Sequence, residues 1–121
     1  MDNLEAIKAN AELVIKTFPN ENLAFDENSI AWLDGYIERN RQDWSAELSE
    51  KLSSILGSFL GECIIKNFGG AWEMTEYGLA VKFKDNNCVY PFNKIKKQFS
   101  NGSDDSILSF YQTIPILFHT S

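Results

Sequence analysis

One segment, residues 52–72, constrains the fold of this 121-residue chain more than any other part of its sequence. Apolar residues recur in it at helical spacing and predict one buried stripe: Leu52, Ile55, Leu56, Phe59, Leu60, Cys63 and Ile64. Gly57 and Gly61 lie on the flank of this stripe, and each costs about 1 kcal/mol relative to alanine inside a helix. Two glycines at this spacing indicate that another backbone packs closely against the helix.

Three helices are predicted in the first part of the chain. The first begins at Asp2 or Asn3 and ends at Thr17. Asp26, or alternatively Ser29, is the expected start of the second helix. Ser45 begins the third, which continues past the two glycines to about Phe68.

After Gly70 the apolar period changes from 3.6 to 2, which indicates strands. The alternation predicts three strands joined by tight turns, over residues 72–75, 79–84 and 88–90. Pro91 cannot donate to a ladder, so the third strand is expected to lie at an edge or to end there. Such a meander has one apolar face, which the glycine-flanked helix is expected to cover.

Two short helices are predicted after the strands. Asn93 is the expected N-cap of the first, over residues 94–99, and Ser103, Asp104 or Asp105 caps the second. Pro115 is expected to kink or end the second helix, and the apolar tail over residues 116–119 is expected to dock on the domain. The predicted fold class is α+β: N-terminal helices, a three-stranded antiparallel meander, and two C-terminal helices packed on one face of the sheet. It forms a single domain over residues 1–121.

Length and composition favour a globular protein in the cytoplasm. The chain is 44% hydrophobic and long enough to bury a core. Its first residues carry acids and amides where a signal peptide needs a basic start and an apolar run. The longest mostly apolar stretch, residues 55–65, is too short to span a bilayer, so no membrane association is expected. Cys63 and Cys88 are interpreted as two buried thiols rather than a disulfide.

The net charge of −6 is unevenly distributed along the chain. Residues 1–50 hold eleven acidic and four basic residues, which gives −7, and the remainder is +1. Nucleic-acid binding relies on phosphate neutralisation by Lys and Arg, so a nucleic-acid partner is not expected. A basic protein partner is permitted, although an acidic surface that only aids solubility is the simpler interpretation.

Four segments form a recognisable series: AWLDGYI at residues 31–37, LGSFLGE at residues 56–62, GAW at residues 70–72 and YPFNKIKK at residues 90–97. Together they resemble a family of small bacterial domains of unknown function that carry an LGxxLGE … W … P … K pattern. The resemblance covers residues 28–113. It implies an α+β fold and a bacterial source, and it assigns no activity and no catalytic residue.

No catalytic or cofactor-binding pattern is recognisable in the sequence. His119 is the only histidine, so a Ser–His–Asp or Cys–His arrangement would have to recruit it near the C-terminus. Potential Cys and His metal ligands are scattered and no phosphate-binding glycine loop occurs, so neither a cofactor nor enzyme activity is expected. Glu62 is the one candidate for acid–base chemistry, because burial can raise the pKa of a carboxyl group. The favoured interpretation is structural: Glu62 pairs with Lys66, or accepts a hydrogen bond from a neighbouring strand or loop.

Five lysines fall within sixteen positions: Lys82, Lys84, Lys94, Lys96 and Lys97. They can combine into one positive patch that binds an anion, a nucleic acid or an acidic partner. The cluster contains no arginine and the whole chain is acidic, which favours a solvated polar face instead.

The leading functional hypothesis is a non-catalytic binding domain with an unknown protein partner, for which a basic protein is one candidate. One version is a bacterial immunity protein that masks a basic toxin, such as a nuclease, with its acidic half. The candidate partner-binding residues lie at or near a corner between two predicted helices: Glu38, Asp43, Trp44 and Glu47. Trp44 has a second interpretation, in which it packs the corner onto the core.

The alternative is a small-ligand-binding protein, or an accessory subunit of an enzyme. Its pocket would lie between the meander and the third helix, beside Gly57, Gly61, Glu62, Trp72 and Tyr77. A third possibility concerns assembly: the chain is either a monomer or a homodimer that packs through the apolar tail over residues 114–118.

Overall fold

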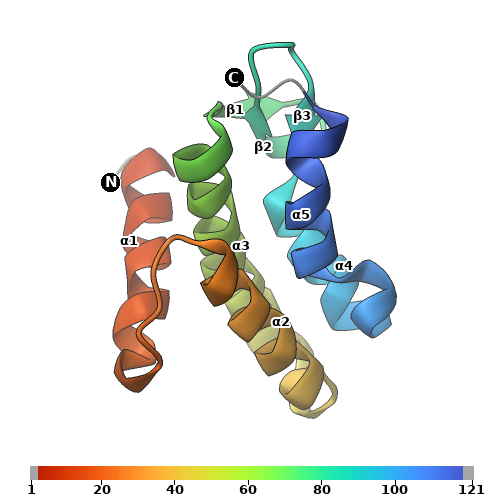
Figure 1. Ribbon diagram of the computed structural model, residues 1–121. Coiled ribbons are helices and arrows are strands. Elements are labelled where there is room, and N and C mark those ends of the chain that lie inside the picture. Colours follow the sequence, from red (N-terminus) through yellow and green to blue (C-terminus); the bar gives the residue numbers. More distant parts are fainter. Residues whose placement is uncertain (1–2, 119–121) are drawn as a thin grey trace.

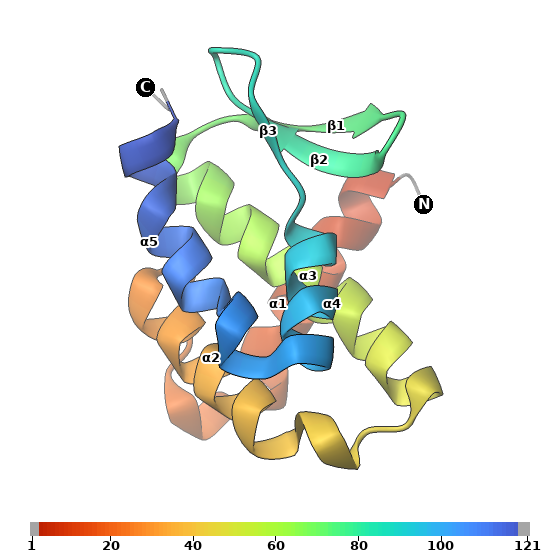
Figure 2. The ribbon, with the colours of Figure 1, turned by 90° about the vertical axis from the view of Figure 1, so that its right-hand side faces the viewer.

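The structure is a computed structural model that describes residues 3–118. It combines helices with a small sheet. Three helices come first, α1 (Asn3–Thr17), α2 (Glu27–Asn40) and α3 (Ala46–Phe68). The strands β1 (Ala71–Thr75), β2 (Gly78–Lys82) and β3 (Cys88–Val89) follow, and then α4 (Pro91–Asn101) and α5 (Ile107–Leu117). The sheet lies at one end of the group of helices (Figures 1 and 2).

Local capping signals set the starts of α2 and α3 as predicted. The side chain of Asp26 accepts a hydrogen bond from the Ser29 amide at 2.8 Å, and Ser45 Oγ accepts one from the Leu48 amide at 3.1 Å. Helix α3 ends at Gly69, which adopts a φ of 90° that side-chain-bearing residues rarely reach.

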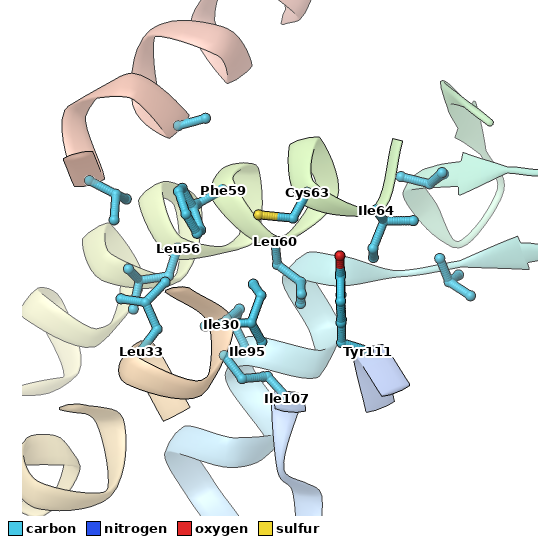
Figure 3. Packing of buried hydrophobic residues seen from close by; sticks show 14 of the residues in the cluster. Ile30, Leu33, Leu56, Phe59, Leu60, Cys63, Ile64, Ile95, Ile107 and Tyr111 are labelled. Atoms are coloured by element: carbon cyan, nitrogen blue, oxygen red, sulfur yellow. The ribbon is translucent and has the colours of Figure 1, made fainter. Parts of the chain in front are cut away.

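Helix α3 forms the centre of the hydrophobic core. Its predicted apolar stripe is buried at Leu56, Phe59, Leu60, Cys63 and Ile64, each at most 2% exposed (Figure 3). Helices α1 and α4 pack against α3, while α5 packs mainly along α2. Side chains from four other helices therefore pack around α3, with α1 on one side of it and α2, α4 and α5 on the other.

The sheet is the predicted antiparallel meander, with strand order β1-β2-β3. A two-residue turn at Glu76-Tyr77 sets the β1–β2 register, in which Trp72 lies opposite Val81. The central strand β2 buries Ala80 and Val81, and both α3 and α4 contact it. Helices α3 and α4 therefore both meet the sheet at its central strand.

The prediction that α4 begins after an Asn93 cap is wrong. Helix α4 begins at Pro91, because proline has a suitable φ and needs no hydrogen-bond partner for its nitrogen in the first turn. The first helical turn closes where the Lys94 amide donates to Tyr90 O at 3.1 Å.

The predicted cap of α5 is also wrong. Its cap is Ser106, whose Oγ accepts from the Ser109 amide at 3.1 Å, whereas residues 102–105 form a 3₁₀ turn. Pro115 does not end the helix, which continues to Leu117. The proline lies in the last turn, and the Phe118 amide still donates to Ile114 O at 3.0 Å.

The apolar tail docks only in part. Ile114 is buried and Phe118 packs on Phe83 with ring centroids 5.7 Å apart, but Ile116 and Leu117 are 80% and 67% exposed. Residues 111, 114 and 118 share one helical face, so Ile116 and Leu117 point away from the core. His119 lies outside the described residues. Within residues 3–118, no helix has the length and apolar character needed to cross a membrane.

Candidate functional site

Aromatic rings fill the space beside the two glycines of α3. A Cβ atom on Gly61 would overlap the indole of Trp72, and one on Gly57 would overlap the ring of Phe92 and lie 3.0 Å from its Cα. The two rings also pack on each other, with centroids 5.6 Å apart. The sequence indicated a close backbone neighbour, but side chains from β1 and α4 make most of the contact.

Glu62 holds one of these rings in place. Its Oε2 accepts a hydrogen bond from Trp72 Nε1 at 2.8 Å, which fixes the indole over Gly61. This bond from a neighbouring strand is one of the two structural roles that the sequence suggested for Glu62. The alternative pairing with Lys66 is not among the ion pairs formed within residues 3–118.

Tyr77 stands apart from the other residues of the predicted ligand pocket. It lies in the β1–β2 turn and is 73% exposed, and its amide donates to Thr75 Oγ1 at 3.1 Å. The structure therefore brings together Gly57, Gly61, Glu62 and Trp72. A ligand beside the glycines would have to displace an aromatic ring.

The corner between α2 and α3 is the predicted partner-binding region. Trp44 is half-buried there and packs on Phe99 and Tyr36, with ring centroids 5.0 and 5.8 Å away. Asp43 and Glu47 are exposed beside it. The indole thus fixes the corner to α4, and it leaves these two carboxylates in solvent.

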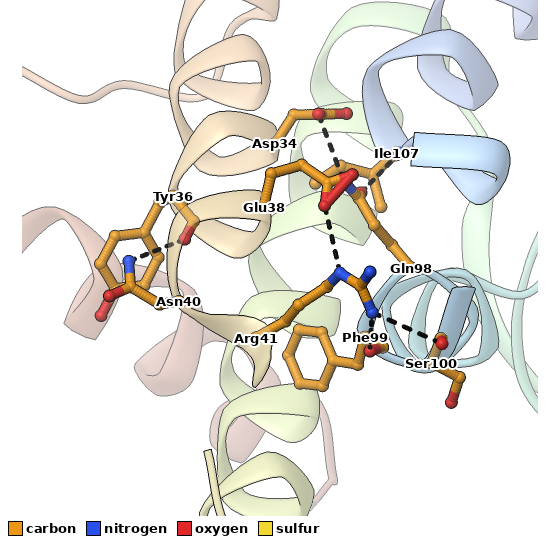
Figure 4. A network of polar contacts seen from close by, with 9 residues as sticks. All are labelled: Asp34, Tyr36, Glu38, Asn40, Arg41, Gln98, Phe99, Ser100 and Ile107. Atoms are coloured by element: carbon orange, nitrogen blue, oxygen red, sulfur yellow. Dashed lines mark hydrogen bonds and ion pairs between the residues drawn. The ribbon is translucent and has the colours of Figure 1, made fainter. Parts of the chain in front are cut away.

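A polar network that the sequence did not reveal joins α2 to α4 (Figure 4). Arg41 Nη1 donates to the carbonyl oxygens of Phe99 and Ser100, at 3.1 and 3.4 Å, near the end of α4. Its Nε donates to Glu38 Oε2 at 3.2 Å. Glu38, one of the predicted partner-binding residues, therefore forms an ion pair within the protein.

Asp34 extends this network to α5. Its carboxylate accepts hydrogen bonds from Ser106 Oγ at 2.5 Å, from the Leu108 amide at 3.1 Å and from Gln98 Nε2 at 3.2 Å. The fully buried Gln98 in turn accepts from the Ile107 amide at 2.9 Å (Figure 4). These contacts provide hydrogen-bond acceptors for the backbone N–H groups at the start of α5, so we assign them a structural role.

Within residues 3–118, burial holds two groups with clearly shifted acidity in their neutral forms. Desolvation raises the pKa of the Cys63 thiol well above its usual value and raises that of Tyr111 to about 12. Tyr111 Oη accepts a hydrogen bond from Asn67 Nδ2 at 3.0 Å. A protonated buried thiol is a poor nucleophile, so Cys63 serves packing. Among the described side chains, no cluster of three or more His, Cys, Asp or Glu residues could hold a metal ion.

A cleft of about 590 Å³ lies between β3, α4 and α5. These elements face the viewer in Figure 2. We name it the lysine cleft, and its lining comprises Cys88, Val89, Tyr90, Asn93, Lys94, Lys96, Lys97, Ser100, Asn101, Phe110 and Phe118. Its volume falls within the range of ligand sites, and its lining contains lysines and aromatic rings but no acidic residue.

The three lysines of this cleft differ in their surroundings. Lys94 Nζ lies 5.2 Å from the centroid of the Phe110 ring, which holds the ammonium group over the aromatic part of the cleft. Lys96 pairs with Glu50 of α3 at 3.3 Å, and both side chains remain at least half exposed. Lys97 is exposed and has no ion pair within residues 3–118.

The predicted patch of five lysines is divided in the structure. Lys82 and Lys84 line a separate hollow together with Glu73, which pairs with Lys82 at 3.3 Å. The sequence therefore identified the basic residues but not their grouping, because that grouping depends on where α4 and α5 meet β3.

Searches against protein-family models, curated proteins and solved structures found no match to this chain.

Proposed function

We propose that this protein is a non-catalytic binding domain whose binding site is the lysine cleft. One observation carries the proposal: a cleft of ligand size combines three lysines with the rings of Phe110 and Phe118 in a chain of net charge −6. Lysines bind anionic groups, and the aromatic rings offer an apolar contact beside them. The cleft therefore suits a molecule that carries negative charge next to an apolar group.

Benzoate is a suitable first probe, because it places a carboxylate directly on an aromatic ring. We expect millimolar benzoate to shift the amide signals of Lys94, Lys97 and Phe110 saturably in a ¹⁵N-correlated NMR titration. Benzyl alcohol, which has a similar ring without the charge, should shift them far less. In a double variant that carries Lys94→Gln and Lys97→Gln, the two probes should shift the amide signals equally little. Equal responses to both probes, or no saturable response, would contradict the proposal.

A second candidate function uses the acidic half of the chain to mask a basic protein, as an immunity protein masks its toxin. The α2–α3 corner favours it, because Trp44 fixes this corner while Asp43 and Glu47 stay exposed and form no ion pair within the described residues. Fixed, unneutralised carboxylates accelerate association with a basic partner. The resemblance to a bacterial family of unknown function is compatible with this candidate.

Co-expression with the product of the neighbouring gene tests this second function. The wild-type protein should co-purify with that product and abolish its toxicity. Glu47→Lys should weaken the complex about fivefold at low salt, whereas the equal charge change Glu76→Lys, in the β1–β2 turn, should not. Toxicity that is unchanged by excess wild-type protein would eliminate the immunity function.

A further inference from the structure

We infer that the occupant of the lysine cleft is an extended acidic segment of a partner protein, which adds a strand to the free edge of β3. The inference rests on the proposed function, because it specifies the ligand of the same cleft. Its evidence is the backbone direction at β3, the length of the α4 wall and the combination of lysines with aromatic rings in the lining.

The backbone of Cys88 points toward the cleft. Strand β3 is at the edge of the sheet, and its register places Cys88 opposite Lys82 and Val89 opposite Val81. The Phe83 amide donates to Asn87 O at 2.9 Å, so the positions that bond to β2 are Asn87 and Val89. By this alternation, the N–H and C=O of Cys88 point to the outer edge. Because β3 lines the cleft and β2 does not, this edge borders the cleft.

The α4 wall of the cleft has the length of a short peptide. Its α4 residues extend from Asn93 to Asn101, which corresponds to about 12 Å along the helix axis. An extended chain covers this distance with about four residues. Edge-strand pairing supplies main-chain hydrogen bonds, and pockets for alternate side chains then supply specificity.

The side chains of the cleft suit an alternating sequence. Lys94 and Lys97 lie three residues apart, so they are neighbours on one face of α4, about 5–6 Å apart at their Cβ atoms. Alternate side chains of an extended peptide are about 7 Å apart on one side, so successive carboxylates can reach both lysines. Apolar side chains between the carboxylates can then contact the aromatic part of the cleft, at Phe110 and Phe118.

Charge and shape favour a peptide over a nucleic acid. Helix α4 carries three lysines and no acidic residue, but the adjoining hollow beside Lys94 is lined by Asp104 and Asp105. These carboxylates would repel a continuous phosphate backbone. A short peptide whose charges alternate with apolar groups can place its carboxylates on the lysines alone.

The test uses a fluorescently labelled six-residue peptide that alternates glutamate with leucine, blocked at both ends. Fluorescence anisotropy should show saturable binding that weakens about tenfold with Lys97→Glu and less than twofold with the matched control Lys16→Glu, on α1. Lys97 and Lys16 are both exposed, so neither change should disturb folding. A peptide with glutamine in place of glutamate should bind at least tenfold more weakly.

The strand-pairing part has its own control. Two versions of this peptide are N-methylated at alternate amides, one at the odd-numbered and one at the even-numbered positions. Only the version whose methyl groups block the amides that pair with β3 should lose most of its affinity. Equal binding of both methylated peptides, equal effects of the two lysine variants, or displacement by a decathymidine oligonucleotide at lower concentration would each overturn the inference. If benzoate shifts the cleft signals but the peptide does not bind, this inference fails alone. If neither binds, the proposed function fails as well.

Discussion

Replacing Gly61 by alanine should destabilise the protein, although alanine is the better helix former. Inside α3 the substitution gains about 1 kcal/mol in helix propensity. Against this, the new methyl group would occupy the position of the Trp72 indole, which lies directly on the glycine. The ring must therefore move, or α3 must shift away from β1.

The size of the effect follows from the contacts that change. Overpacking a well-filled interior costs about 1–3 kcal/mol. Moving the indole also strains or breaks the 2.8 Å hydrogen bond from Trp72 Nε1 to Glu62, worth about 1–1.5 kcal/mol with a half-exposed carboxylate. After the propensity gain is subtracted, we expect Gly61→Ala to lower the free energy of unfolding by about 2 kcal/mol.

Urea denaturation followed by circular dichroism measures this change. Gly35→Ala in α2 is the matched control, because a Cβ there would meet only the end of the flexible Arg39 side chain. The control should be neutral or stabilising by up to about 1 kcal/mol. Adding Trp72→Leu to Gly61→Ala should make the two effects clearly non-additive, since the smaller side chain leaves room for the methyl group. If Gly61→Ala stabilises the protein as much as Gly35→Ala, the indole does not occupy the space beside Gly61.

Four further predictions concern stability, reactivity and assembly. Asp34→Ala should cost about 2–4 kcal/mol in urea denaturation, because it leaves the Ser106 hydroxyl and the Leu108 amide without their acceptor; a loss below 0.5 kcal/mol would contradict the role of the network. Tyr111 has a raised pKa, so its protonated form favours folding; stability should fall as pH rises from about 10 to about 12, and Tyr111→Phe should reduce that dependence in alkaline denaturation. Cys88, which is half-buried, should react with a thiol reagent before the buried Cys63, and the opposite order would be inconsistent with this packing. Light scattering should give the 13.8 kDa mass of a monomer, because the exposed tail is too small for a stable dimer interface; a doubled mass would support pairing through that tail.

The parts of the fold that depend on nearby residues could be predicted from the sequence. Asp26 and Ser45 cap their helices through amides three residues away, and the change from helical to alternating periodicity located the meander. The start of α4 was missed because the Asn93 side chain suggested a cap, while Pro91 supplied a suitable first helical residue.

The parts that depend on distant residues could not be predicted in the same way. Two glycines in α3 signalled a close neighbour, but nothing local identified Phe92, which is 35 positions after Gly57. The bond from Ser106 to Asp34 joins residues 72 positions apart. For the same reason the sequence predicted one patch of five lysines, whereas the folded chain separates Lys82 from the lysine cleft.

The most direct test asks whether a ligand binds in the lysine cleft between β3 and α4. Intermolecular nuclear Overhauser effects between the unlabelled glutamate–leucine peptide and isotope-labelled protein test this directly. We predict contacts from leucine methyl groups to the rings of Phe110 and Phe118, together with slowed hydrogen exchange at the Cys88 amide. Contacts confined to α1 or to the α2–α3 corner, with Cys88 exchange unchanged, would contradict the account.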